Sequence, residues 1–184
     1  MLKISFNLDD ADLEHFAAAA QQKQALARSR PADAIVAAAR EVLEKAEGAQ
    51  LAGFVKERYS RLATMLDMVH DAQWQLGDED RQRVINALAC FAPGSAGSGT
   101  ELLDHAIMIE LVSRDLHHDL DAYRDFCRSR DSLDQKRRAA PAAEREQWLQ
   151  QRRESLQARM HQRRKRDLDA AGSSVRKLFS LFGL

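Results

Sequence analysis

Apolar residues recur every three or four positions along most of this chain, the spacing that places them on one face of an α-helix. The longest such run lies between Glu101 and Arg130. Its first half is apolar on nearly every side and its second half on one side only. We therefore expect a long central helix that is buried at first and then emerges toward solvent. The positions predicted to share its buried stripe are His105, Ile109, Val112, Leu116, Leu120, Tyr123 and Cys127.

Shorter helical patterns precede this run, bounded by aspartate, proline and glycine. They are expected from about residue 11 onward, between Pro31 and Gly48, over 51–76, and after Asp78, which would act as a cap. A Gly/Ser loop over 93–99 leads to Thr100, the expected N-cap of the central helix. Residues 2–8 alternate apolar with polar, which predicts a short strand or an extended arm. The fold class is therefore all-α, with at most one N-terminal strand.

The last quarter of the chain differs in pattern from the rest. A polar hinge containing Pro141 precedes a helix expected over 144–170, whose sparse apolar edge is Leu149, Leu156 and Met160. Gly172 and two serines separate this helix from a short tail. We therefore divide the chain into a helical domain over 1–135 and a basic helical extension over 136–184.

Charge supports this division. The net charge of the chain is zero, but residues 1–135 carry −8 and residues 136–184 carry +8. Such a split indicates either a basic arm that reaches for an anionic partner or an arm that folds back on an acidic body.

Cysteine use and hydropathy bear on the compartment. Cys90 and Cys127 are isolated in apolar helical patterns, which is typical of small core residues in a reducing cytosol. The N-terminus has acidic residues where a secretion signal needs an apolar run, and no stretch approaches the roughly 20 apolar residues of a spanning helix. We expect a cytoplasmic protein, at most peripheral to the inner face of the membrane.

Residues 3–130 resemble the YkvA-like family of bacterial domains of unknown function. The resemblance rests on "AQWQLGDEDRQRVINALACFA", on "LLDHAIMIELVSRDLHHDLDAYRDFCRSR", and on the opening "ISFNLDDADLEHF". The positions that match the family pattern are Trp74, Phe91 and Asp104; at the second aspartate of the family's Asp-Asp pair this chain has His105. The family's Asp-Leu-Ile-Pro-Asp turn is replaced here by "PGSAGSGTE". The resemblance therefore does not by itself imply, for this chain, a family function that depends on this turn and this aspartate pair; the altered loop marks either a lost function or a changed one.

Candidate chemistry in the domain is sparse. His117 and Asp121 lie four residues apart on one predicted helical face, but a metal needs three or four converging ligands. His105 falls on the buried stripe, where a hydrogen-bonded core histidine is the common case. The loop serines match no nucleophile or phosphate-binding pattern. We therefore expect no catalytic residue, metal or cofactor. A metal-dependent enzyme using Asp104, His105, His117 or Asp121 remains an alternative.

The C-terminal extension carries the strongest functional pattern. Its arginines align within about 60° on the predicted helix, with Trp148 at the edge. The tail "VRKLFSLFGL" places Phe179 and Phe182 on one apolar side. We predict a non-catalytic protein whose arm binds an anionic membrane surface or a protein partner, with nucleic-acid binding as the alternative. The residues predicted to act are Arg145, Trp148, Arg152, Arg159, Arg163, Arg166, Phe179 and Phe182.

Overall fold

The computed structural model describes residues 10–91, 101–136 and 141–170, and in these ranges the secondary structure is entirely helical. The predicted all-α class is confirmed. The expected strand over 2–8, the loop with Thr100 and the tail with Phe179 and Phe182 lie outside the described residues. The helices are α1 (Asp10–Ala27), α2 (Ala32–Glu47), α3 (Gly53–His70), α4 (Asp78–Leu88), the 3-10 turn η1 (Ala89–Phe91), α5 (Glu101–Asp115), α6 (His117–Lys136) and α7 (Ala142–Ala170).

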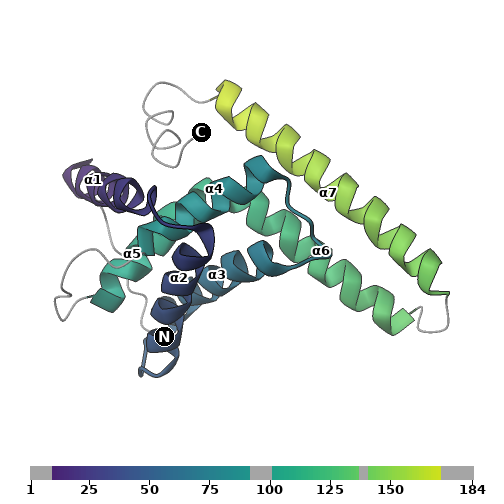
Figure 1. Ribbon diagram of the computed structural model, residues 1–184, viewed down its shortest axis with the longest axis horizontal. Helices are drawn as coiled ribbons and strands as arrows, with labels where there is room; N and C mark the ends of the chain where they lie inside the picture. The colour runs from purple at the N-terminus through teal and green to yellow at the C-terminus, as the bar shows by residue number, and fades with distance from the viewer. Residues whose placement is uncertain (1–9, 92–100, 137–140, 171–184) are drawn as a thin grey trace.

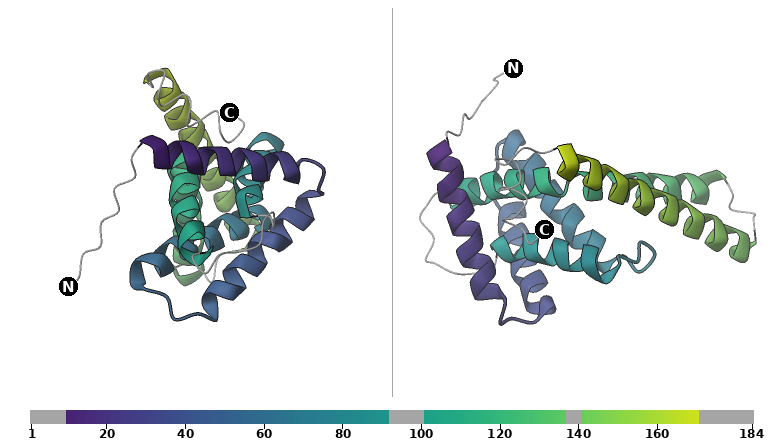
Figure 2. Two further views of the ribbon diagram at one scale, coloured as in Figure 1. Left: turned by 90° about the vertical axis from the view of Figure 1, so that its left-hand side faces the viewer. Right: turned by 90° about the horizontal axis from the view of Figure 1, so that it is seen from above.

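One hydrophobic core joins these helices, whose arrangement is drawn in Figures 1 and 2. Helix α2 packs on α3 and α4, α3 packs on α5, and α1 lies across η1. Because the apolar residues of each helix recur on one side, the packed faces exclude water together. The largest fully buried side chains include Trp74, Phe91, Phe126, Leu62 and Met65. Cys90 is also buried, and burial raises the pKa of its thiol to about 12.

The predicted central helix is divided into α5 and α6 at Leu116. Its stripe is buried as expected from His105 to Tyr123, and Cys127 is half-buried. The division coincides with two backbone carbonyls that accept side-chain hydrogen bonds. The Arg83 guanidinium donates to the Asp115 carbonyl at 3.0 Å, and His117 Nδ1 lies 2.7 Å from the Arg114 carbonyl. Both interactions compete with the hydrogen bonds of a regular helix, which explains the local break.

Helix α3 ends at His70, so the expectation that it continues to Leu76 is wrong. Asp71 explains the early end, because its Oδ1 accepts the backbone N–H groups of Gln73 at 2.9 Å and Trp74 at 3.3 Å. This turn at Asp71 directs the Trp74 side chain into the core. Helix α4 then begins at Asp78 itself with Gly77 as the N-cap, so Asp78 is a first-turn residue and not the expected cap.

Asp71 should make the stability of the fold sensitive to acid. Its Oδ2 accepts hydrogen bonds from Tyr123 Oη at 3.1 Å and Arg130 Nη1 at 2.7 Å. Burial acts to raise the pKa of Asp71, but these bonds and the Arg130 charge outweigh it and hold the pKa below the usual 3.8. A lowered pKa in the folded state stabilises the fold above pH 3.8, and this stabilisation is lost as the pH falls further. Urea unfolding between pH 5 and 2.5 should therefore show a steeper loss for the wild type than for Asp71→Asn. If the free energy of unfolding falls equally with pH in both proteins, this role of Asp71 is contradicted.

Helix α7 packs antiparallel along α6, and the pair extends away from the other helices (Figures 1 and 2). The predicted apolar edge faces the protein: Leu156 and Met160 are fully buried and Leu149 packs at the margin. Near one end Arg145 pairs with Asp134, and near the other His118 lies 2.8 Å from Asp167. The basic helix therefore folds back on its own chain, which was one of the two arrangements that the charge split indicated.

Candidate functional site

A cluster of buried charges lies where α4, the α5–α6 junction and α7 meet. Arg83 is only 4% exposed and Asp119 is completely buried. The Arg83 guanidinium donates to Asp119 Oδ2 at 3.1 Å and to Asp115 Oδ2 at 3.2 Å. A buried guanidinium needs such partners, because an unpaired charge in the interior costs several kcal/mol. We call this set, together with the α7 residues described next, the buried charge cluster.

Helix α7 completes the cluster. Arg164 donates to Asp119 Oδ1 at 3.2 Å and pairs with Asp80, while His161 Nε2 lies 2.7 Å from Asp80 Oδ2. Two guanidinium groups thus flank Asp119, one from α4 and one from α7. The cluster joins residues that are far apart in the sequence and fixes α7 against the core.

The pKa values of the three carboxyl groups follow their surroundings. Burial raises the pKa of Asp115 to about 6 despite the nearby Arg83, and burial also raises the pKa of Asp119. At Asp80 burial acts in the same direction, but the bonds to His161 and Arg164 outweigh it and the pKa falls below its usual value. The bonds to His161 and Arg164 therefore hold Asp80 ionised more firmly than its two more strongly desolvated neighbours.

A hollow of about 330 Å³ opens beside this cluster. His117 and His118, the first two residues of α6, have ring centroids 3.7 Å apart. Both approach Asp167 of α7, whose Oδ2 is 3.7 Å from His117 Nε2 and 2.8 Å from His118 Nε2. This is the set of side chains, within the described residues, that could hold a metal ion.

The five predicted arginines fall into two groups. Arg145 pairs with Asp134, and Arg152 Nε donates to Ser129 Oγ at 3.0 Å, so both face α6. Trp148 is half-buried beside them in a shallow groove with Arg128. The other three, further along α7, are exposed and have no carboxylate partner among the described residues: Arg159, Arg163 and Arg166.

Of the four positions singled out in the predicted resemblance, three lie in the core and one is exposed. Trp74 and Phe91 are buried, and His105 is buried with its ring 6.0 Å from the Phe91 ring. Asp104 is exposed. His105 thus occupies the buried position predicted for it.

The four residues considered for a metal-dependent enzyme do not come together in one site. His117 meets His118 and Asp167, whereas Asp121 is exposed and lies 4.0 Å from Arg124. His105 and Asp104 are not part of that histidine cluster. The partner of His117 is instead its neighbour His118, because a new helix begins at His117 and the two rings lie together.

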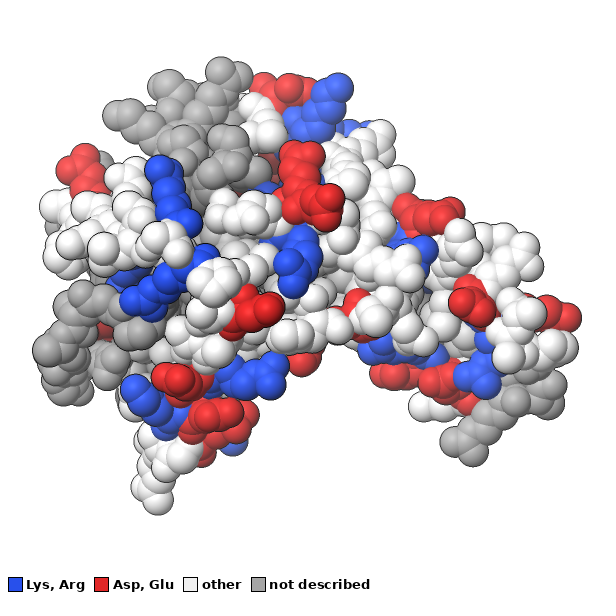
Figure 3. All heavy atoms as spheres, in the orientation of Figure 1, with Lys and Arg blue, Asp and Glu red and all other residues white. Residues whose placement is uncertain are grey.

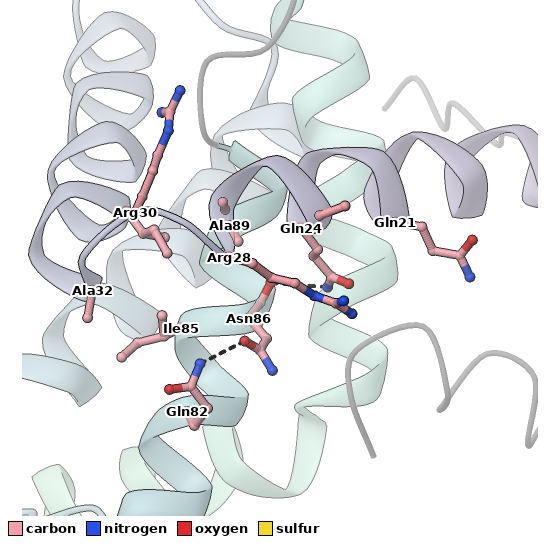
Figure 4. Close-up of a pocket in the computed structure, with 12 residues that line it drawn as sticks. Gln21, Gln24, Arg28, Arg30, Ala32, Gln82, Ile85, Asn86 and Ala89 are labelled. Atoms are coloured by element: carbon pink, nitrogen blue, oxygen red, sulfur yellow. Dashed lines mark hydrogen bonds between the residues drawn. The ribbon is translucent and has the colours of Figure 1, made fainter.

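A larger hollow, of about 590 Å³, lies between α1, α2 and α4 (Figure 4). Its amide side chains bond within the protein: Gln24 Nε2 donates to the Asn86 carbonyl at 3.1 Å, and Gln82 Nε2 to Asn86 Oδ1 at 2.9 Å. Among the described residues, the lining contains no carboxylate or histidine. It offers fewer groups for chemistry than the hollow beside the buried charge cluster.

Sequence reasoning missed the buried charge cluster. Asp115 and Asp119 lie four residues apart next to the buried Leu116 and Leu120, which was an available sign that the carboxylates face inward. His161 and Arg164 similarly border the apolar edge of α7. Their partners could not be found from the sequence, because the contacts span 32 to 84 residues.

The fold and the site define an all-helical protein with a charged hollow and a C-terminal helix that carries exposed arginines. Comparison with protein-family models, with curated proteins and with solved structures finds no match to this chain. The resemblance to the YkvA-like family stays a prediction from the residues quoted above.

Proposed function

We propose that this protein is non-catalytic and binds anionic membrane surfaces through the exposed arginines of α7. Arg159, Arg163 and Arg166 lie on one side of the helix, about one turn apart, and together span about two turns. We call them the free arginine row. Guanidinium groups bind phosphate oxygens by paired hydrogen bonds, so the row suits lipid headgroups. In this proposal α7 would bring the preceding helical domain, for which we predict a YkvA-like fold, to the membrane.

The observation that carries the proposal is the contrast within α7. Its other arginines are engaged: Arg145, Arg152 and Arg164 contact α6 residues, and Arg153 donates to the Gln73 carbonyl at 3.2 Å. The free arginine row has no such contacts in the described part of the chain. On the face drawn in Figure 3, acidic and basic side chains are interspersed. An exposed row of one sign therefore points to a partner of opposite charge.

The tail favours a membrane over other anionic partners. Its sequence "VRKLFSLFGL" adds two basic residues and the apolar Phe179 and Phe182 after the free arginine row. Weak apolar insertion and electrostatic attraction strengthen each other at an anionic bilayer. No helix in the described ranges is both long enough and apolar enough to cross a membrane. Binding at the surface is the mode that we propose.

Replacing the free arginine row with glutamine should weaken binding to phosphatidylglycerol vesicles roughly 100-fold, since each basic residue near an anionic surface contributes about 1 kcal/mol. Co-sedimentation at low and high salt measures this effect. The substitutions leave Leu156, Met160 and the buried charge cluster intact. A truncation before α7 would not be a clean test, because it removes core side chains.

A matched control replaces three exposed basic residues elsewhere, Arg40, Lys45 and Lys56, with glutamine. This control changes the net charge equally and should retain binding. Equal losses in both variants would indicate a general charge effect and contradict the proposal. A different result would be that the wild type does not bind vesicles but binds DNA, and that the logarithm of its binding constant falls with the logarithm of salt concentration with a slope of about −2.7. The arginines would then contact nucleic acid instead.

A further inference from the structure

We infer that His117, His118 and Asp167 bind one divalent transition-metal ion, such as Zn²⁺, in the hollow beside the buried charge cluster. The ligand atoms that these side chains offer all lie within 4.8 Å of one another. A tetrahedral zinc ion with bonds of about 2.0–2.1 Å places its ligands about 3.3 Å apart. Small side-chain rotations therefore bring the three atoms to one ion.

The two helices give the site a defined position. The rings of His117 and His118 lie together at the start of α6, immediately after the break at Leu116. Asp167 faces them from α7, which the buried charge cluster holds in place through Arg164 and His161. Ligands from elements fixed by other contacts lose little entropy when an ion binds.

The hydrogen bonds of His117 suit a metal ligand. Its Nδ1 lies 2.7 Å from the Arg114 carbonyl, to which it donates. Nε2 then carries the lone pair and faces Asp167. Metal-binding histidines commonly use the second ring nitrogen in this way, because a carbonyl partner fixes both the tautomer and the ring orientation.

Unpaired buried atoms at the same hollow are an independent sign of a missing ligand. Asp115 Oδ1, His118 Nδ1 and Arg83 Nε are buried and lack a hydrogen-bond partner among the described residues. All three residues line the hollow, and Asp115 is only 8% exposed. Buried polar atoms are rarely left unpaired, so an ion with its bound water would satisfy groups that protein atoms do not.

The local charge is compatible with a cation. Three cationic side chains line the hollow, but Arg83 and Arg164 are already paired with carboxylates of the buried charge cluster. Lys165 is the remaining cation of the lining, and it is outnumbered by Glu79, Asp167 and Asp169. Two imidazoles and one carboxylate are borderline ligands that favour zinc, iron, cobalt or nickel over magnesium or calcium.

The test is isothermal titration calorimetry with Zn²⁺ on full-length, tag-free protein previously treated with EDTA. We expect one ion per chain. His117→Gln and Asp167→Asn should each weaken binding at least tenfold, since each removes one of three ligands. Both side chains are nearly half exposed, at 44% and 45%, so the variants should fold. His70→Gln, an exposed histidine at the end of α3, is the matched control and should bind as the wild type does.

Two results would overturn the inference. The wild type could bind no Zn²⁺ at one equivalent, or both ligand variants could bind it with unchanged affinity, which would place the ion elsewhere, for example at a thiol. Thermal unfolding gives a second readout: Zn²⁺ should raise the melting temperature of the wild type and of His70→Gln, but not that of His117→Gln.

Discussion

Replacing Arg83 with methionine should lower the free energy of unfolding by about 3–5 kcal/mol, the usual cost of breaking a buried ion pair. Methionine fills much of the same volume but leaves Asp119 and Asp115 without the guanidinium that they share. Asp119 is completely buried, so water cannot replace the lost hydrogen bonds. Urea unfolding at pH 7.5, followed by circular dichroism, measures the loss.

Arg61 provides the control for this prediction. It donates to Glu110 Oε2 at 2.9 Å, but its side chain is 24% exposed and solvent screens the pair. Arg61→Met should therefore cost less than about 1 kcal/mol. The double variant Arg83→Met with Asp119→Asn should recover part of the stability, because the fold then no longer buries at residue 119 a negative charge that Arg164 alone balances. If Arg83→Met costs no more than Arg61→Met, solvent reaches the buried charge cluster and our description of it is wrong.

Replacing Trp74 with alanine should be similarly severe, at about 3–5 kcal/mol. The indole is fully buried, with its ring centroid 5.7 Å from Tyr123 and 5.2 Å from Phe126. Alanine would leave a cavity between the turn after α3 and helix α6, where the surrounding rings cannot collapse completely. Thermal unfolding followed by circular dichroism is the suitable measurement.

Two further variants separate the contribution of volume from that of hydrogen bonding at this position. Trp74 Nε1 is buried without a partner in the described part of the chain, so Trp74→Phe sacrifices no hydrogen bond. It should cost less than about 1.5 kcal/mol, as conservative core changes do. Trp148→Ala, on the half-buried side of α7, should also be mild. A Trp74→Ala loss no larger than that of Trp148→Ala would contradict the central role of the indole.

The sequence was informative where structure depends on neighbouring residues. Helix α2 lies between Pro31 and Gly48 as predicted, because proline and glycine act locally on the backbone. Leu156 and Met160 were recognised as a packing edge because helical spacing brings them together. The partner of that edge, α6, was not specified by the pattern, since any apolar groove would suit it.

Prediction failed where distant residues decide the outcome. The break at Leu116 coincides with a guanidinium that arrives from residue 83 and occupies a helix carbonyl. The histidine and aspartate cluster requires α7 to run antiparallel to α6, which spacing within either helix cannot reveal. Aspartate is usually exposed, so nothing in the sequence near Asp119 indicated that two arginines from different helices would bury it.

The pairing of Arg164 with Asp80 and Asp119 has a consequence for biosynthesis. Arg164 is 84 residues from one carboxylate and 45 from the other, so a ribosome produces both acidic partners long before their cation. A nascent chain that ends before α7 also exposes the apolar surface that Leu156 and Met160 later cover. We therefore expect the earlier helices to complete their packing only after α7 has been translated. Apolar surface that is exposed until then is the kind that chaperones bind.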